Sequence, residues 1–423
     1  MEVFALNGLV VCVGVSVLTL LALVFVAVIL PRRAARAGAA RGRAGAGAIA
    51  LQFIATLLVA VLLMASTGLW INRAFAMYTS WSDLFLGSGE ATVTTDGHVE
   101  AAPGEQKKLA GAQTAAVPTS LKNPLRDPAL KGVTDTRAGQ WVTMDVPGTA
   151  SDVHTEALVY LPAGYLENPE QRYPVILAFS GIPGSPEAFR DAFHLHDLIE
   201  ERVKEGTMRP TIIVSPRVYP GHYDTECVDQ SDPTGHGRAG RGSAAVPAGR
   251  KPSVARGQGT QWETWISEDL AIAARQHLRT VEDPDAWATY GYSAGGWCAT
   301  MISVRHPQVA RTSLSLGGYF TPDYAKGQRW NPPGDPRYDL PKLLAKDRPA
   351  VRMYFYAGGD DPLPKPSLKA LRASLGSDPA PLQFTAAIAE RGGHAMTVWT
   401  AHGGDSLDWL TGQVPAFRPA KAG

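Results

Sequence analysis

The chain has 423 residues, of which 40 are basic and 39 are acidic, so its net charge is close to zero. This balance argues against the strongly positive surface that nucleic-acid-binding proteins use, and we expect no nucleic-acid partner. With three cysteines and no C-x-x-C or H-x-x-x-H pair, we also expect no metal and no cofactor. The length is sufficient for one large domain together with additional segments.

Two long stretches near the N-terminus, residues 3–31 and 44–72, contain no charged residue. Each exceeds the roughly 20 apolar residues that cross a bilayer as a helix. A buried core helix is the alternative, but an uncharged stretch of this length disfavours it. The sequence therefore predicts a segment of residues 1–72 with two transmembrane helices, at about 8–30 and 49–71.

The loop between the two predicted spans, residues 31–45, is basic and has no acidic residue. It contains Arg32, Arg33, Arg36, Arg41 and Arg43. The positive-inside rule places such a short loop in the cytoplasm, so the rest of the chain is expected outside, anchored to the lipid bilayer of the cell membrane. A secretory signal peptide would have its positive charge before the apolar stretch, and here the charge follows it.

Residues 73–140 are predicted to form an extracytoplasmic linker. Gly, Ala, Thr and Pro are scattered through it, with little apolar periodicity. Trp70, Trp81 and Phe85 near its start are typical of side chains that anchor a protein at the membrane interface. They could equally belong to a small helix packed on the second span.

The pattern changes at about residue 141, where alternating strand and helix signals begin. Two segments with strand character are expected to pair in antiparallel fashion, and six further strand candidates follow, separated by helical patterns such as 186–204 and 264–278. The strands are expected at 142–146, 156–161, 174–179, 211–214, 286–290, 312–316, 351–356 and 382–388. This alternation predicts an α/β domain over residues 141–415, with a mostly parallel central sheet, helices on both faces and a short tail at 416–423.

Residues 286–299 read as a buried strand, a turn and a helix, with Ser293 at the tip of a G-x-S-x-G turn. This is the nucleophile elbow, in which Gly291 and Gly295 leave room for the strand and the helix to approach each other. In a chain with 43 glycines the motif alone is weak, because chance produces roughly 0.2 matches. A glycine-rich turn is the alternative, so the surrounding residues have to support the assignment.

A serine nucleophile needs a base and an acid, and suitable residues follow the last two predicted strands. His394, flanked by glycine, is the candidate base, and His402 is the fallback. Asp360 and Asp361 both stand at the end of the strand at 351–356, and only one can orient the histidine. We favour Asp361 because it is spaced as G-x-x-D. The resulting order Ser, Asp, His is that of α/β-hydrolases.

An oxyanion hole requires two backbone N–H groups. One is expected from Ala294, directly after the nucleophile, and the other from the loop at 180–184. Pro183 in that loop has no N–H, so Ile182 is the expected donor.

Of the three cysteines, Cys12 lies in the first predicted span and is interpreted as a small apolar residue. Cys227 and Cys298 both belong to the part expected outside, where a disulfide can form. Such a bond would hold a long loop beside Ser293. Two unpaired buried thiols are the alternative.

Several segments together resemble the putative esterase family of the α/β-hydrolase fold, which includes esterase D and the antigen 85 mycolyltransferases. They are residues 159–165, 174–184, 291–296 and 393–394. The resemblance covers about residues 141–415. More narrowly, residues 224–229, 263–266 and 291–299 are similar to membrane-tethered esterase-like proteins of actinobacteria.

This resemblance implies a Ser-Asp/Glu-His triad with an oxyanion hole, at Ser293, Asp361, His394, Ile182 and Ala294. A long insertion at 218–261, rich in Gly, Arg and Ser, is expected to cover or border the site.

We therefore predict a membrane-anchored serine esterase that hydrolyses a carboxylic ester outside the cell membrane. Tethering beside a bilayer suggests lipid-linked substrates, with acyl or aminoacyl groups on lipids. The alternatives are an acyltransferase acting on cell-envelope glycolipids and a non-catalytic envelope scaffold that kept the fold.

Overall fold

The computed structural model of the chain describes residues 6, 8–33, 46–75, 78, 80–99, 103–134, 137–231, 260–329, 331–377 and 379–419. Glu2, most of the predicted basic loop, residues 232–259 of the predicted insertion and the end of the predicted tail lie outside these residues. The chain divides into two compact units. The first comprises residues 1–90 with the loops 358–362 and 389–398, and the second comprises the remainder.

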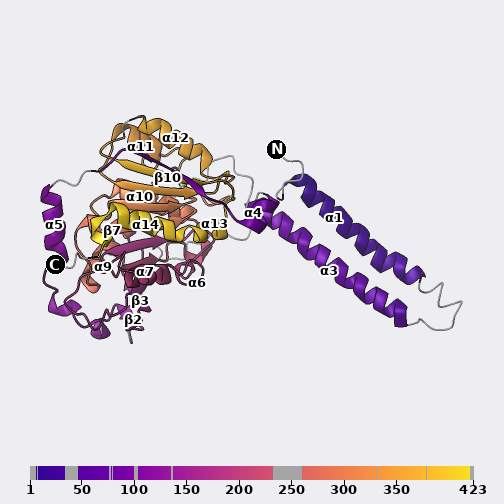
Figure 1. Cartoon of the computed structure of the whole chain (residues 1–423), viewed down its shortest axis with the longest axis horizontal. Coiled ribbons are helices and arrows are strands. Elements are labelled where there is room, and N and C mark those ends of the chain that lie inside the picture. The colour runs from indigo at the N-terminus through magenta and orange to yellow at the C-terminus, as the bar shows by residue number, and fades with distance from the viewer. Residues whose placement is uncertain are drawn as a thin grey trace. The chain divides into compact units, whose positions relative to one another are not determined.

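The first unit contains two long helices. Helix α1 spans Leu9–Val24 and continues through a π-helical turn at Phe25–Ile29, and α3 spans Ala46–Phe75. They run side by side as a pair (Figure 1). The segments Leu9–Arg33 and Ala50–Arg73 are long and apolar enough to cross a membrane, and most of their side chains are not buried within the protein.

Several polar side chains of this helix pair lie between the helices. The hydroxyl groups of Ser16 and Ser66 are 2.9 Å apart, and the indole N–H of Trp70 donates to the Ser16 hydroxyl at 3.0 Å. The hydroxyl of Thr19 donates to its own helix at the carbonyl of Val15, 2.7 Å away. The pair thus places polar groups at the helix contact and leaves its apolar surface outside, as helices packed in lipid do.

In the described part of the second unit, ten strands form one sheet in the order β1-β10-β9-β8-β7-β5-β6-β4-β3-β2. The strands are β1 (Ala91–Asp96), β2 (Leu130–Lys131), β3 (Gln140–Val146), β4 (Thr155–Leu161), β5 (Val175–Phe179), β6 (Ile212–Pro216), β7 (Trp287–Tyr292), β8 (Thr312–Leu316), β9 (Arg352–Ala357) and β10 (Gln383–Ala389). Along this order, the strands from β10 through β9, β8, β7 and β5 to β6 pair in parallel. The pairs β6–β4, β4–β3 and β3–β2 are antiparallel.

The eight strands predicted from the sequence are all present, within a few residues at their ends. The predicted antiparallel pair is β3 and β4, in which Val142 lies opposite Val159. Every residue of β5, β6, β7, β8 and β9 is buried. Strand β5 is a continuous apolar run, as expected where both faces of a parallel sheet are covered, whereas β8 (Thr312–Leu316) alternates polar and apolar residues although all of them are buried.

Two neighbouring residues of β7 show that helices cover both faces. The Thr289 hydroxyl donates to the carbonyl of Ala299 in α10, at 2.7 Å, whereas the Tyr290 hydroxyl lies 3.4 Å from the Ser406 hydroxyl in α14. Successive residues of a strand point to opposite faces, so α10 (Ala294–Arg305) and α14 (Gly403–Gln413) lie on opposite sides of the sheet. The predicted fold class is confirmed.

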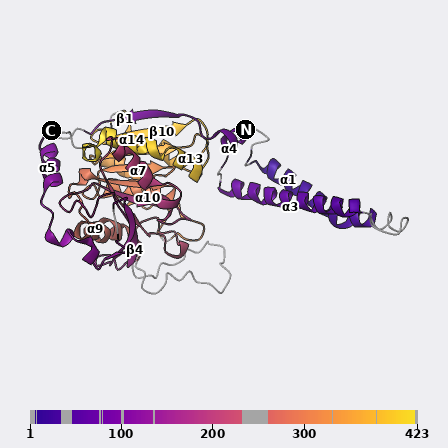
Figure 2. The ribbon, with the colours of Figure 1, turned by 60° about the horizontal axis from the view of Figure 1, so that its bottom comes forward.

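The remaining helices surround this sheet (Figure 2). Instead of one helix at 186–204, α6 and α7 are separated at His194, whose φ is 48°. The helix predicted at 264–278 contains a π-helical segment at Trp265–Leu270. The helices are α6 (Ala188–Asp191), α7 (Leu195–Lys204), α8 (Trp262–Thr264), α9 (Ala271–His277), α11 (Leu340–Lys346), α12 (Lys365–Leu375) and α13 (Met396–Ala401).

The segment predicted as a linker, residues 73–140, contains regular structure. Helix α4 (Trp81–Leu86) belongs to the first unit, while α5 (Pro103–Thr114), β1 and β2 belong to the second. Strands β1 and β2 are the two outermost strands of the sheet. Almost every side chain of β1 is exposed and β2 has only two residues, so neither leaves an apolar pattern in the sequence.

Candidate active site

Ser293 lies on the sharp turn between β7 and α10. Its φ of 55° and ψ of −126° are outside the regions that residues with a side chain ordinarily occupy. The surrounding contacts impose this conformation. The Ser293 N–H donates to the carbonyl of Leu316 at 2.9 Å, and its own carbonyl accepts from the N–H of Gly296 at 2.9 Å.

The two glycines of the motif are required by close approach. A Cβ on Gly291 would lie 2.1 Å from the carbonyl oxygen of Gly295, and a Cβ on Gly295 would lie 1.9 Å from the carbonyl oxygen of Phe179. Both distances are far below van der Waals contact. The strand and the helix thus approach each other as the motif predicts, and Ser293 sits on a true strand-turn-helix elbow.

The loop at 180–184, which follows β5, approaches the nucleophile. A Cβ on Gly181 would lie 2.9 Å from the Cβ of Ser293. Ile182 comes next in this loop and is joined to Pro183 by a cis peptide bond. In the part of the chain that the structure describes, no backbone carbonyl accepts a hydrogen bond from the N–H of Ile182. Ala294 opens helix α10, where the first N–H groups lack partners within the helix.

Asp361 and His394 form a hydrogen-bonded pair. Oδ2 of Asp361 lies 2.9 Å from Nδ1 of His394. The Asp361 side chain is completely buried and that of His394 is 14% exposed. Asp360, the competing acid, is exposed. Of the two adjacent aspartates, Asp361 is thus the one that contacts the predicted base.

These two residues lie on loops that follow neighbouring parallel strands. Asp361 comes four residues after the end of β9, and His394 comes five residues after the end of β10. Ser293 directly follows β7 of the same parallel sheet. The carboxyl ends of parallel strands meet at one edge of a sheet, which is where α/β proteins bind ligands.

His402, the fallback base, has other contacts. Its Nδ1 lies 2.6 Å from Oδ2 of Asp405, and its ring stacks on Tyr356 at a centroid distance of 4.5 Å. Asp405 is in the first turn of α14. His402 therefore belongs to the start of this helix.

Cys227 and Cys298 form a disulfide, with their Cα atoms 5.7 Å apart. The bond connects the loop after β6 to the first turns of α10, close in sequence to Ser293. Cys12 is a free, buried thiol in α1, and its Sγ lies 3.5 Å from the carbonyl oxygen of Leu69.

Glu226 precedes Cys227 of this disulfide, and sequence reasoning did not identify a role for it. Its side chain is fully buried, and Oε1 accepts a hydrogen bond from the Tyr319 hydroxyl at 2.5 Å. Burial is the main cause that raises the pKa of Glu226 well above its usual value, and nearby Asp224 raises it further. A glutamate between a threonine and a cysteine gives no sequence signal for such burial.

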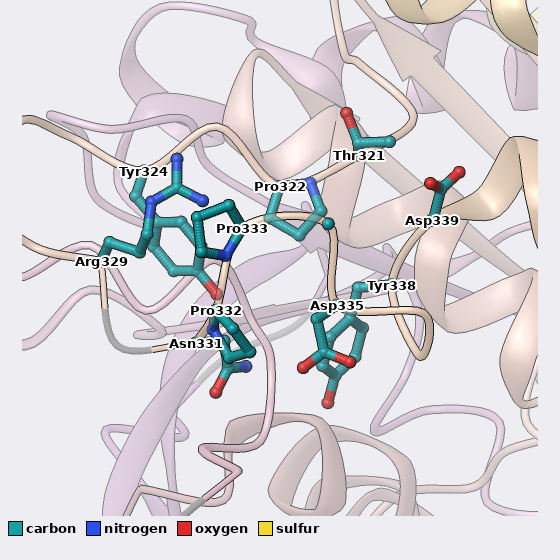
Figure 3. Close-up of a pocket in the computed structure, with 11 residues that line it drawn as sticks. Thr321, Pro322, Tyr324, Arg329, Asn331, Pro332, Pro333, Asp335, Tyr338 and Asp339 are labelled. Atoms are coloured by element: carbon teal, nitrogen blue, oxygen red, sulfur yellow. The ribbon is translucent and has the colours of Figure 1, made fainter. Parts of the chain in front are cut away.

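The loop after β8 also packs on the elbow helix. The ring of Tyr319 stacks on Trp297, with centroids 6.3 Å apart and planes 11° from parallel. Further along, this loop encloses a cavity of about 290 Å³. Figure 3 shows its walls, where Arg329 lies over the Tyr324 ring at 5.3 Å. The lining residues are Thr321, Pro322, Tyr324, Arg329, Asn331, Pro332, Pro333, Gly334, Asp335, Tyr338 and Asp339.

Among the described residues, no group of three or more His, Cys, Asp or Glu side chains is arranged to hold a metal ion. The chemistry that the site offers is that of a hydroxyl nucleophile with an imidazole paired to a carboxylate.

A strained serine on an elbow, in a mostly parallel sheet with an Asp-His pair on the loops after its last two strands, defines an α/β-hydrolase. The model of the family described as "Putative esterase" matches residues 149–405, which is more than half of the chain. The chain therefore belongs to the putative esterase family.

An uncharacterized protein of Corynebacterium glutamicum is 23% identical over 200 residues, which are 46% of this chain and 41% of that protein. The match thus spans less than half the length of this relative.

Among solved structures, an S-formylglutathione hydrolase from Agrobacterium tumefaciens is similar with a TM-score of 0.52 at 14% identity, covering 67% of this chain and 99% of that one. A ferulic acid esterase has a TM-score of 0.49 at 17% identity, covering 65% of this chain and 98% of that one. The first of these likenesses shows the shared fold.

Proposed function

We propose that the protein is a membrane-anchored serine esterase with the triad Ser293, Asp361 and His394, and with its catalytic body outside the cytoplasm. The observation that carries the proposal is the hydrogen bond between Asp361 and the Nδ1 of His394. Asp361 and His394 follow β9 and β10 along the chain, and Ser293 follows β7 of the same parallel sheet. The chain order Ser, Asp, His is also that of the fold.

The hydrogen bond to Asp361 fixes which nitrogen of His394 can act as the base. Nδ1–H donates to the carboxylate, so Nε2 is left to accept the proton of the Ser293 hydroxyl. The serine oxygen then attacks the carbonyl carbon of the ester. The N–H groups of Ile182 and Ala294 hold the negative charge that develops on the carbonyl oxygen. His394 then gives its proton to the departing alcohol, which leaves an acyl group on Ser293.

The second half of the reaction decides between hydrolysis and transfer. Water activated by His394 releases the acid, whereas another alcohol in the same position receives the acyl group. Both outcomes use the same residues. Turnover of the acyl-enzyme in the presence of a glycolipid acceptor separates them, because a transferase forms acylated acceptor faster than free acid.

The proposed location of the catalytic body is supported by the apolar helices and the charges beside them. Arg32 and Arg33 end the first apolar helix and are followed by further arginines before the second, which favours a cytoplasmic loop. The disulfide between Cys227 and Cys298 supports an oxidising compartment for the body. Degradation of the body by a protease added to intact spheroplasts tests this orientation.

The substrate class that we propose is a lipid-linked ester, with an acyl or aminoacyl group on a membrane lipid. Support comes from the anchor, which keeps the catalytic body beside a bilayer and raises the local concentration of such esters. Equal turnover of a lipid ester in vesicles by anchored and released protein would contradict it.

The nucleophile and the base are tested by labelling the full-length protein in membranes with a fluorophosphonate, which reacts with activated serines. We expect labelling of the wild type and its loss in Ser293→Ala and in His394→Ala. His402→Ala is the matched control, because this histidine is bound to Asp405 and should leave labelling intact. Labelling that persists in Ser293→Ala would place the nucleophile elsewhere.

A further inference from the structure

The chain segment that leads from the apolar helices to the sheet contacts the loop that carries His394. The N–H of Arg391 donates to the carbonyl of Ser88 at 3.0 Å, and the N–H of Glu390 donates to the carbonyl of Glu90 at 3.0 Å. Both partners lie directly before β1, the outermost strand beside β10. Residues 88–90 therefore extend the edge pairing of the sheet onto the catalytic loop.

On its other side, the same loop is bonded to the loop that carries Asp361. The carbonyl of Arg391 accepts from the N–H of Gly359 at 3.0 Å, and the carbonyl of Gly392 accepts from the N–H of Asp360 at 3.0 Å. Residues 390–392 thus lie between two segments, with residues 88–90 on one side and residues 359–360 on the other. The loop that holds the base is fixed from both sides by backbone hydrogen bonds.

Close packing accompanies these bonds. A Cβ on Gly392 would lie 3.2 Å from the Cβ of Ser88, and a Cβ on Gly89 would lie 3.0 Å from Oε2 of Glu390 and 3.2 Å from a guanidinium nitrogen of Arg391. Ser88 is only 6% exposed. A side chain added at either glycine would require its neighbours to move, so the two segments are closely packed.

A further contact joins the end of α3 to the helix that follows His394. The side chain of Asn72 donates to the carbonyl of Tyr78 at 2.8 Å and accepts from its N–H at 2.7 Å. The Tyr78 hydroxyl lies 3.5 Å from the Thr397 hydroxyl in α13. The stretch between the second apolar helix and the sheet therefore contacts the region around His394 twice, at Tyr78 and at residues 88–90.

We propose that residues Ser88–Glu90 are positioning residues for His394: the segment that follows the membrane anchor holds the catalytic loop so that the imidazole stays paired with Asp361. This proposal rests on the proposed function, in which His394 is the base. His394 follows two glycines, which leave the loop backbone free to move unless neighbours restrain it. A base displaced by about 1 Å loses much of its effect on the rate.

The chain offers a matched pair of glycines for a test in the full-length protein. Gly89 has a φ of 73° and faces the loop, whereas Gly87 has a φ of 74° and a Cβ added to it would meet no atom within 4 Å. Gly89→Val and Gly87→Val therefore impose the same backbone conformation on valine, but only the first pushes against Glu390 and Arg391.

Two measurements are made on both variants in detergent micelles. The first is the hydrolysis of p-nitrophenyl butyrate, for which we expect kcat of Gly89→Val to fall about tenfold or more while KM stays within about twofold. Gly87→Val should keep both constants within about twofold of the wild type. The second is amide hydrogen exchange in peptides covering residues 389–395, which we expect to become about tenfold faster only in Gly89→Val.

The exchange measurement decides the contact independently of catalysis. Unchanged exchange in Gly89→Val, or equal kcat in the two variants, would overturn the positioning role. If Ser293→Ala hydrolysed the ester as fast as the wild type, the proposed nucleophile would be wrong. A selective change of exchange in Gly89→Val would in that case still show that residues 88–90 hold the loop.

Discussion

The indole N–H of Trp297 donates a hydrogen bond of 2.9 Å to the backbone carbonyl of Glu226. The next residue of the elbow helix, Cys298, is bonded to Cys227, so two consecutive residues of this helix hold two consecutive residues of the loop after β6. Glu226 and Cys227 have φ values of 48° and 53°, which residues with side chains seldom adopt. The elbow helix thus both supports Ser293 and keeps this loop in an unfavourable conformation.

Removal of the disulfide should destabilise the catalytic body. The bond joins residues 71 positions apart, and closing a loop of this length is worth about 4 kcal/mol in the chain-entropy account. We expect the double variant Cys227→Ser, Cys298→Ser to lower the thermal midpoint of the body by roughly 10 °C. Cys12→Ala, in the apolar helices, is the control that should not move it. Equal midpoints with and without reductant would contradict the prediction.

Glu226 should make the stability of the fold depend on pH. Its pKa is raised by burial first and by Asp224 second, while the hydrogen bond from Tyr319 opposes the shift. Its Oε2 has no hydrogen-bond partner among the residues that the structure describes. The folded state therefore binds the proton of the Glu226 carboxyl group more tightly than the unfolded chain does. The stability that this proton contributes is complete below about pH 4.5 and is lost as the pH rises toward the pKa of Glu226 in the folded state.

Glu226→Gln removes this titration and keeps an oxygen for Tyr319. Between about pH 5 and pH 8 we expect the free energy of unfolding of the wild type to fall, relative to the variant, by at least about 1 kcal/mol. Chemical denaturation at a series of pH values measures it. The exposed Glu268→Gln is the control and should follow the wild type. Parallel pH profiles for wild type and Glu226→Gln would show that Glu226 does not titrate in this range.

The parts of the fold that were predicted from the sequence have local causes. Strand β5 is buried on both faces and appears as an apolar run, and the elbow requires glycine at positions 291 and 295 because a Cβ there would overlap the backbone. Ser293 and His394 were predicted as nucleophile and base from these patterns and from their order along the chain.

The parts that were missed depend on contacts between distant residues. The edge strand β1 and the hydrogen bond from Arg391 to Ser88 use backbone groups, which every residue type has. The choice between Asp360 and Asp361 depends on which side chain faces His394. No local pattern distinguishes two adjacent aspartates, and the structure was needed to show which one makes the contact.

The elbow should not tolerate a methyl group on Gly295. A Cβ there would lie 1.9 Å from the carbonyl oxygen of Phe179 and 2.5 Å from its carbonyl carbon, so strand β5 and helix α10 would have to separate. We expect Gly295→Ala to cost about 3 kcal/mol of stability and to abolish fluorophosphonate labelling. Gly412→Ala in α14 is the matched control: a Cβ there meets no atom within 4 Å, and the change should stabilise by about 0.5–1 kcal/mol. Normal stability of Gly295→Ala would contradict the elbow geometry.

The two adjacent aspartates should differ sharply in their effect on the rate. Asp361→Asn replaces the carboxylate 2.9 Å from His394 with a neutral amide, which no longer stabilises the imidazolium or fixes the tautomer that leaves Nε2 free. We expect kcat for p-nitrophenyl butyrate to fall by about 10⁴-fold with little change in KM. Asp360→Asn removes an exposed carboxylate one position away and should keep kcat within about threefold. Because both variants lose one charge in the same loop, a general electrostatic effect would lower both rates alike. A larger loss in Asp360→Asn than in Asp361→Asn would transfer the role of the acid to Asp360.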